Sequence, residues 1–111
     1  INIQKIGAEF ENHPAFPDRI NTEFVQPISA SHIKMRVWER GAGETLSCGT
    51  GACAAAAAAI KNGYAHKNEE IAVRMRGGDL SVKITEEHTY LTGEATFVFV
   101  GEIDLWSSIS R

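Results

Sequence analysis

The sequence predicts an α+β fold in which an antiparallel sheet, curled like a barrel, wraps around one central helix. Two observations lead to this prediction. Most of the chain divides into short runs of alternating or β-branched residues separated by glycines, which is typical of strands joined by tight turns. Residues 52–60 are almost all alanine. A helix of this composition has no polar face, so we expect the sheet to surround it on every side.

Length and composition limit the class of protein. The 111 residues predict a single domain, 1–111, that can bury a real core. A net charge of −3 without charged runs argues against nucleic-acid or anionic-membrane partners, and no apolar stretch is long enough for a membrane span. Cys48 and Cys53 fit neither a disulfide scaffold nor a CxxC motif, so a reducing, cytoplasmic setting is expected. The chain opens on Ile1, which suggests a piece of a longer protein.

The first third of the chain predicts three strands. Alternating isoleucines predict a short strand over residues 1–6, and prolines limit residues 7–19 to a brief helical turn. Residues 22–28 predict the second strand. Residues 33–39 alternate apolar and polar side chains, the pattern of a strand with one wet face.

Glycines separate these strands from the helix. Gly41 and Gly43 break the strand pattern at positions suited to positive φ, and Asn62-Gly63 ends a helix expected over about residues 50–62. Four further strands are predicted to follow as an antiparallel run, over residues 71–76, 79–84, 89–93 and 94–103.

The start of this helix carries the residues best suited to chemistry. The unpaired N–H groups of a helix N-terminus bind anions and stabilise a thiolate, and Cys48 lies there. Gly49 and Gly51 allow close approach of a ligand, and Thr50 can cap the helix or donate to a carboxylate. Cys53, deeper among the alanines, is interpreted as an inert small apolar residue.

Other site types have weaker support. The CGTGAC segment lacks the Lys-Ser/Thr of a phosphate loop and the GxGxxG spacing, and the neighbouring strands look antiparallel, so a dinucleotide site is not expected. The four histidines are scattered without metal-ligand spacing. Glu39 and Arg40 suit ammonium and carboxylate binding, although such a pair is more often a solvated strand end.

The stretch VWERGAGETLSCGTGACAA, residues 37–55, resembles the C-terminal half of diaminopimelate epimerase. HPAFPDRINTEFVQ, residues 13–26, resembles that family's HPxFPxRxNxxF segment, and LTGEATFVFVGEI resembles its closing strands. The resemblance implies two similar domains, each a sheet around a central helix. It also implies a cofactor-independent isomerase of lysine and peptidoglycan precursor biosynthesis, which interconverts LL- and meso-2,6-diaminopimelate with two cysteines and uses no metal.

The same resemblance implies roles for particular residues. Cys48 matches one of the two catalytic thiols, and Glu39 matches a group that supports proton transfer and contacts substrate. The further substrate-contacting positions are Asn21, Arg40, Gly49 and Thr50. The domain with the second thiol and the NPH stretch between the domains are absent, so this chain alone is predicted to be inactive. Its partners would be diaminopimelate and the missing N-terminal half, and the resemblance allows a homodimer of the full-length enzyme.

Three alternatives remain open from the sequence. Proline and hydroxyproline racemases use a similar CGTG thiol and fold, but the ERGAGET stretch favours the diaminopimelate enzyme. Isomerases of the phenazine-biosynthesis type share the fold without the cysteine pair, so Cys48 counts against them and they are not among the three. The chain can also be a non-catalytic module that binds an amino-acid carboxylate through CGTG. A third reading is an interaction domain that leaves Ile1 and Ile3 exposed for its missing half.

Overall fold

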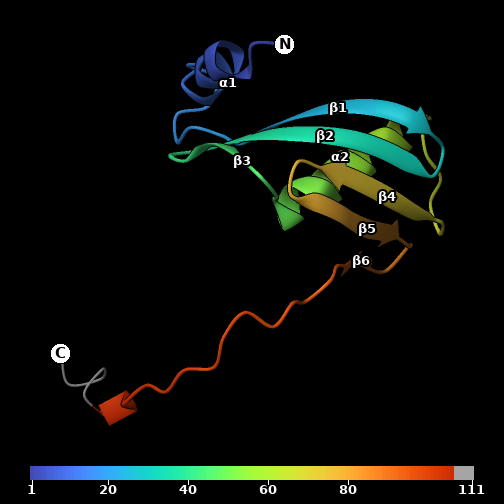
Figure 1. Cartoon of the computed structure of the whole chain (residues 1–111). Helices are drawn as coiled ribbons and strands as arrows, with labels where there is room; N and C mark the ends of the chain where they lie inside the picture. Colours follow the sequence, from blue (N-terminus) through green and yellow to red (C-terminus); the bar gives the residue numbers. More distant parts are fainter. Residues whose placement is uncertain (107–111) are drawn as a thin grey trace.

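The computed structural model describes residues 1–106 and confirms the α+β class, with two helices and a sheet of six strands (Figure 1). The helices are α1 (Ile3–Glu11) and α2 (Gly49–Lys61). The strands are β1 (Thr22–Ser29), β2 (His32–Glu39), β3 (Gly43–Thr45), β4 (Glu70–Met75), β5 (Gly78–Ile84) and β6 (Thr89–Thr92).

The sheet is open, and one of its pairings is parallel. The strand order is β1-β2-β4-β5-β6, and β3 pairs with the end of β2. β2 and β4 run in parallel with Ile33 opposite Val73, whereas the other pairs are antiparallel. The prediction of antiparallel neighbours is therefore wrong at this pair. The reason is that α2 carries the chain back along the sheet, so β2, α2 and β4 form a parallel crossover unit.

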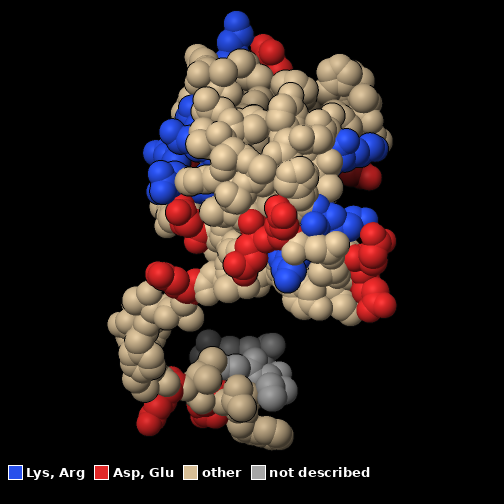
Figure 2. Space-filling view, turned by 90° about the vertical axis from the view of Figure 1, so that its right-hand side faces the viewer, with Lys and Arg blue, Asp and Glu red and all other residues tan. Residues whose placement is uncertain are grey.

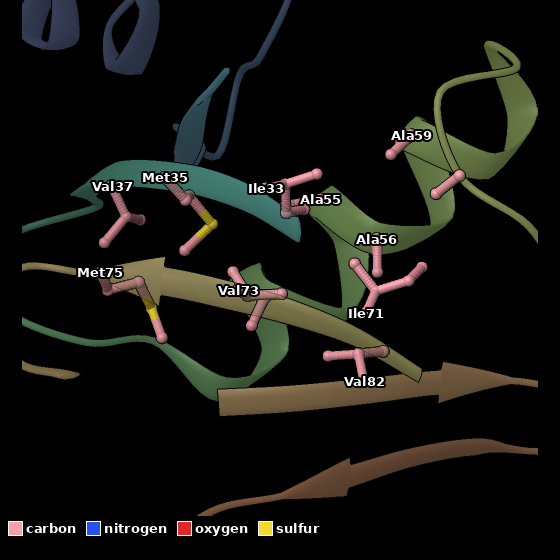
Figure 3. Close-up of a cluster of buried hydrophobic side chains, with 12 residues drawn as sticks. Ile33, Met35, Val37, Ala55, Ala56, Ala59, Ile71, Val73, Met75 and Val82 are labelled. Atoms are coloured by element: carbon pink, nitrogen blue, oxygen red, sulfur yellow. The ribbon is translucent and has the colours of Figure 1, made fainter. Parts of the chain in front are cut away.

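One face of α2 forms the core with the sheet. Ala55 and Ala56 face the buried side chains of Ile33, Ile71 and Val82 (Figure 3). Because alanine side chains are short, the helix axis can approach the strands closely. The predicted Ala-rich helix packed on the sheet is thus present.

The other face of α2 is exposed in this chain. Ala54, Ala57 and Ala58 are exposed, so the expectation of cover on every side is wrong for the described residues. An open sheet covers only one side of a helix, which is the physical reason. Beside this exposed face lies a hollow of about 230 Å³, lined by Val25, Pro27, Ala55, Ala58, Ala59, Asn62 and Tyr64.

The start of the chain is a helix, not the predicted strand. Ile3, Gly7 and Glu11 are the buried residues of α1, and Asn2 caps it by accepting a hydrogen bond from the backbone N–H of Lys5. Their spacing of four places them on one helical face, which prevails over the local alternation of isoleucines. Ile3 is fully buried, so the expected exposed pair reduces to Ile1.

The predicted strand over residues 94–103 is also absent. The chain leaves the sheet after β6 and extends away from it (Figure 1). Phe97, Val98, Phe99 and Val100 are each 79–84% exposed. A strand exists only beside a hydrogen-bonding neighbour, and this segment finds none among residues 1–106.

Candidate functional site

Cys48 lies at the N-terminus of α2, and its own thiol caps the helix. Sγ accepts a hydrogen bond from the backbone N–H of Gly51 at 3.4 Å, and it lies 3.6 Å from Oγ1 of Thr50. The expected cap, Thr50, is instead inside the first turn. The half-buried thiol therefore receives both the positive end of the helix dipole and a directed N–H donor.

Two close backbone approaches fix the segment that enters α2. The N–H of Gly77 donates to the carbonyl of Leu46 at 2.8 Å, and a Cβ on Gly77 would come 2.9 Å from that same oxygen. A Cβ on Gly49 would come 2.9 Å from Cδ2 of Leu91. These contacts tie the thiol's neighbours to the β4–β5 turn and to β6.

The short strand β3 is anchored by a buried carboxylate. Glu44 accepts two hydrogen bonds from Arg36, at 2.7 and 2.9 Å, and pairs with Nη1 of Arg76 at 3.0 Å. The bond from Arg36 is the main reason that the pKa of Glu44 lies below its ordinary value. Thr45, the next residue, donates its hydroxyl to Oε2 of Glu39. β3 therefore holds the Glu39 carboxylate in place.

One direct hydrogen bond brings Asn21 and the backbone of Arg40 together. Oδ1 of Asn21 accepts from the backbone N–H of Arg40 at 2.8 Å, and the Arg40 guanidinium donates to the carbonyl of Asp18 at 3.1 Å. Arg40 is exposed. Its side chain lies near the predicted site, but it is hydrogen-bonded to the loop that precedes β1.

Glu23, which the sequence analysis did not single out, links these groups to the thiol. It faces Val37 in the β1–β2 register, so it shares the sheet face of Glu39, two residues further along β2. Burial raises the pKa of Glu23 above its ordinary value; its own backbone N–H opposes this shift, and the charge of Glu39 adds to it. A partial signal was present in the sequence, since Asn21 and Glu23 are two apart and such residues share one face of a strand, but it did not place that face beside Cys48.

The site residues therefore lie next to one another, but hydrogen bonds among the described residues do not join them into one network. Among residues 1–106, no hydrogen bond joins the Cys48 thiol to Asn21, Glu39 or Arg40. Cys48 and Cys53 both pack against the hydrophobic core, but Cys53 lies inside α2, five residues after the N-cap. The group bordered by β1, the end of β2 and the start of α2 is called the helix-mouth site below: Asn21, Glu23, Glu39, Arg40, Cys48, Gly49, Thr50 and Gly51.

The described part of the chain contains neither a metal-binding cluster nor a membrane-spanning helix. Over residues 1–106, no three or more His, Cys, Asp or Glu side chains are placed to hold a metal ion. None of the described helices is long and apolar enough to cross a membrane.

Fold and site together define an α+β domain whose crossover helix presents a thiol at its N-terminus, a type of domain suited to thiol chemistry beside a bound carboxylate. A sequence model described as diaminopimelate epimerase matches residues 1–98. The chain belongs to the diaminopimelate epimerase family.

Named relatives agree with this assignment. The chain is 53% identical over 104 residues to a diaminopimelate epimerase of Desulfovibrio desulfuricans, covering 92% of this chain and 36% of that protein. It is 52% identical to those of Acetivibrio thermocellus and Methanococcus maripaludis strain C6, covering 93% of this chain and 37% of each relative. The chain therefore spans somewhat more than a third of the length of these relatives.

Proposed function

We propose that this chain is the C-terminal part of a cofactor-independent epimerase that interconverts LL- and meso-2,6-diaminopimelate in lysine and peptidoglycan precursor biosynthesis. Its relatives carry the name diaminopimelate epimerase. The observation that carries the proposal is the position of Cys48, at the N-cap of α2 with the Gly51 N–H on its sulfur.

The chemistry requires a base on one face of the α-carbon and an acid on the other. In this proposal the Cys48 thiolate removes the α-proton, or its thiol returns one, while the second thiol comes from the remainder of the protein. Negative charge develops beside the substrate carboxylate, where the N–H groups of the α2 N-terminus can stabilise it. Gly49 and Thr50 offer the backbone and hydroxyl donors for that carboxylate.

The remaining site residues have supporting roles in the proposal. Asn21 and Arg40 supply the amide and guanidinium that suit the second carboxylate of the substrate. Glu39, held by the Thr45 hydroxyl, supports proton transfer and binds an ammonium group. We propose that Cys53 takes no part, because it lies inside α2 and not at the N-terminus that would face the substrate.

Two exposed apolar surfaces support the proposal that a missing part of the enzyme docks on this chain. One is the face of α2 with Ala54, Ala57 and Ala58, beside the apolar hollow described above. The other is the segment 97–100, which stands clear of the body between acidic residues (Figure 2). Apolar surfaces of this kind mark interaction sites, and the occupant we assign is the remaining part of the same epimerase.

The deciding experiment is α-proton exchange of diaminopimelate in deuterated water. We expect no exchange with this chain alone, and exchange when it is mixed with the separately expressed remainder of a full-length relative. Cys48→Ala should abolish the exchange in the mixture, whereas the matched Cys53→Ala variant should retain it. Glu39→Gln should slow the exchange by about 10²-fold or more.

The same assay separates the alternatives. Exchange with proline but not with diaminopimelate would favour a racemase of the proline type. If the two parts associate and bind diaminopimelate, yet exchange nothing, the chain is a binding module. Exchange by the chain alone would contradict the proposed need for a second thiol.

A further inference from the structure

The side chain of Glu23 reaches from β1 to the first turn of α2, beside the Cys48 thiol. A Cβ atom built on Gly51 would come 2.8 Å from Oε1 of Glu23 and 3.2 Å from Sγ of Cys48. The carboxylate and the sulfur therefore border the same small space. That space is open because residue 51 has no side chain.

In the described part of the chain, the surroundings of Glu23 supply a backbone N–H donor but no cation. Within residues 1–106 it forms no ion pair, and the charged group that acts on it from β2 is a second carboxylate, Glu39. From α2 the titratable group beside it is Cys48 itself. From β6 the nearby residue at this helix end is the apolar Leu91, against Gly49.

Two opposing influences therefore act on the Cys48 sulfur. The N–H of Gly51 and the helix dipole favour the thiolate, whereas a carboxylate at close range disfavours it. A thiol that must remove a proton in one direction and return it in the other needs neither form to dominate at working pH. A neighbouring carboxylate, which favours the neutral thiol, opposes the helix N-terminus, which favours the thiolate.

We propose that Glu23 acts through Cys48: its carboxylate lies beside the first turn of α2, and its negative charge sets the pH at which that thiol ionises. The role of the balance in catalysis rests on the proposed function. The charge effect on the thiol is a property of this chain and can be measured without any substrate.

The test follows alkylation of Cys48 by iodoacetamide as a function of pH, with Cys53→Ala as the background so that one thiol reacts. Replacing Glu23 with Gln preserves the shape and removes the charge. We expect the midpoint of the alkylation profile to fall by about 0.5 to 1 pH unit, since the pair is half-exposed and partly screened by water. Glu23→Asp keeps the charge and should largely restore the original midpoint.

Glu9→Gln is the matched control, because it removes an exposed carboxylate from α1. Its midpoint should equal that of the background chain. An unchanged or higher midpoint in Glu23→Gln would overturn the proposal. So would an equal fall in the Glu9 control, since that would report net charge rather than this pair.

A second measurement needs no Glu23 variant and covers the case in which Glu23→Gln does not fold. The carboxyl ¹³C signal of Glu23 should show an inflection at the pH where Cys48 ionises, and Cys48→Ser should abolish it. Absence of the inflection in the folded background chain would overturn the proposal. A normal inflection together with no α-proton exchange in the reconstituted mixture would instead count against the proposed function alone.

Discussion

At the scale of single residues, Glu11 is a carboxylate nearly removed from water that joins three segments of the chain. It accepts hydrogen bonds from Nε1 of Trp38 at 2.8 Å, from the backbone N–H of Gly41 at 3.1 Å and from Arg19 at 2.8 Å. The bond from Trp38 is the main reason that the pKa of Glu11 lies below its ordinary value of 4.5. Gly41 directly follows Arg40, so the hydrogen bond to Glu11 also holds the turn next to this residue of the helix-mouth site.

The lowered pKa of Glu11 predicts how stability depends on pH. A carboxyl with a folded pKa below its unfolded value stabilises the fold fully above the unfolded pKa, and loses that contribution as the pH falls through the folded pKa. Glu11→Gln should therefore be less stable than the original chain above about pH 5 and equally stable once both are uncharged at low pH. Urea midpoints measured between about pH 2 and pH 7 by circular dichroism test this.

Glu9→Gln, on the exposed side of the same helix, is the control for Glu11. It should follow the original chain at every pH. A constant difference between Glu11→Gln and the original chain, extending down to the lowest pH, would mean that the hydrogen bonds depend on shape and not on charge.

At the scale of elements, α1 packs against the sheet through a glycine. A Cβ on Gly7 would come 2.5 Å from Cγ and 2.8 Å from Cε3 of Trp38, both inside the ring system. The same indole donates to Glu11, so the ring cannot turn aside without breaking that bond. The packing of α1 against Trp38 therefore requires a glycine at position 7.

Gly7→Ala should destabilise the chain by about 1 to 3 kcal/mol because of this clash. Helix propensity alone predicts the opposite, a gain of about 1 kcal/mol for replacing a glycine inside a helix. Unfolding in urea distinguishes the two, and Glu9→Ala in the same helix should change the stability by less than about 0.5 kcal/mol. A stabilised Gly7→Ala chain would show that α1 can move off Trp38.

The sequence predicted well those elements whose apolar side chains are buried by contacts within this chain. β2 was predicted because Ile33, Met35 and Val37 alternate and are buried on one face, and α2 because its alanines end at Asn62-Gly63. α1 was mistaken for a strand because its buried face repeats every four residues, at Ile3, Gly7 and Glu11, and a period of two is misleading over six residues. The parallel pairing of β2 with β4 could not be read locally, since it depends on the path of α2.

The candidate site divides in the same way. Cys48 was recognisable from its place before a helix, and Glu39 and Arg40 from the resemblance. Glu23 was missed because its neighbour, Gly51, is 28 positions away, and only the packing of β1 on α2 brings the two together. Sequence spacing identified the groups on the helix but not the group facing it from the sheet.

At the scale of the whole molecule, the chain has an unbalanced distribution of apolar residues. The core lies between α2 and the sheet, while residues 97–100 extend into water with four large apolar side chains in a row. A continuous apolar run is typical of a strand buried on both faces. The segment therefore contributes little to this fold, and under the proposed function it is a surface on which the remainder of the enzyme docks.

Charging this segment should separate folding from association. The double variant Phe97→Asp/Phe99→Asp should unfold within about 0.5 kcal/mol of the original chain, yet lose association with the separately expressed remainder in analytical ultracentrifugation. Glu102→Gln, in the same exposed segment, should leave both unchanged. A large loss of stability would show that Phe97 and Phe99 pack on this chain, and retained association would show that the remainder binds elsewhere.

Because β2 and β4 are parallel, the length of α2 between them is constrained. Parallel neighbours begin at the same end of a sheet, so the chain must return along the whole of β2 before β4 can start. α2 covers about 20 Å of that return with its 13 residues. One residue added inside it would turn the Cys48 end by about 100° relative to the far end. We therefore expect an insertion in the loop over residues 62–69 to be tolerated better than an insertion inside α2.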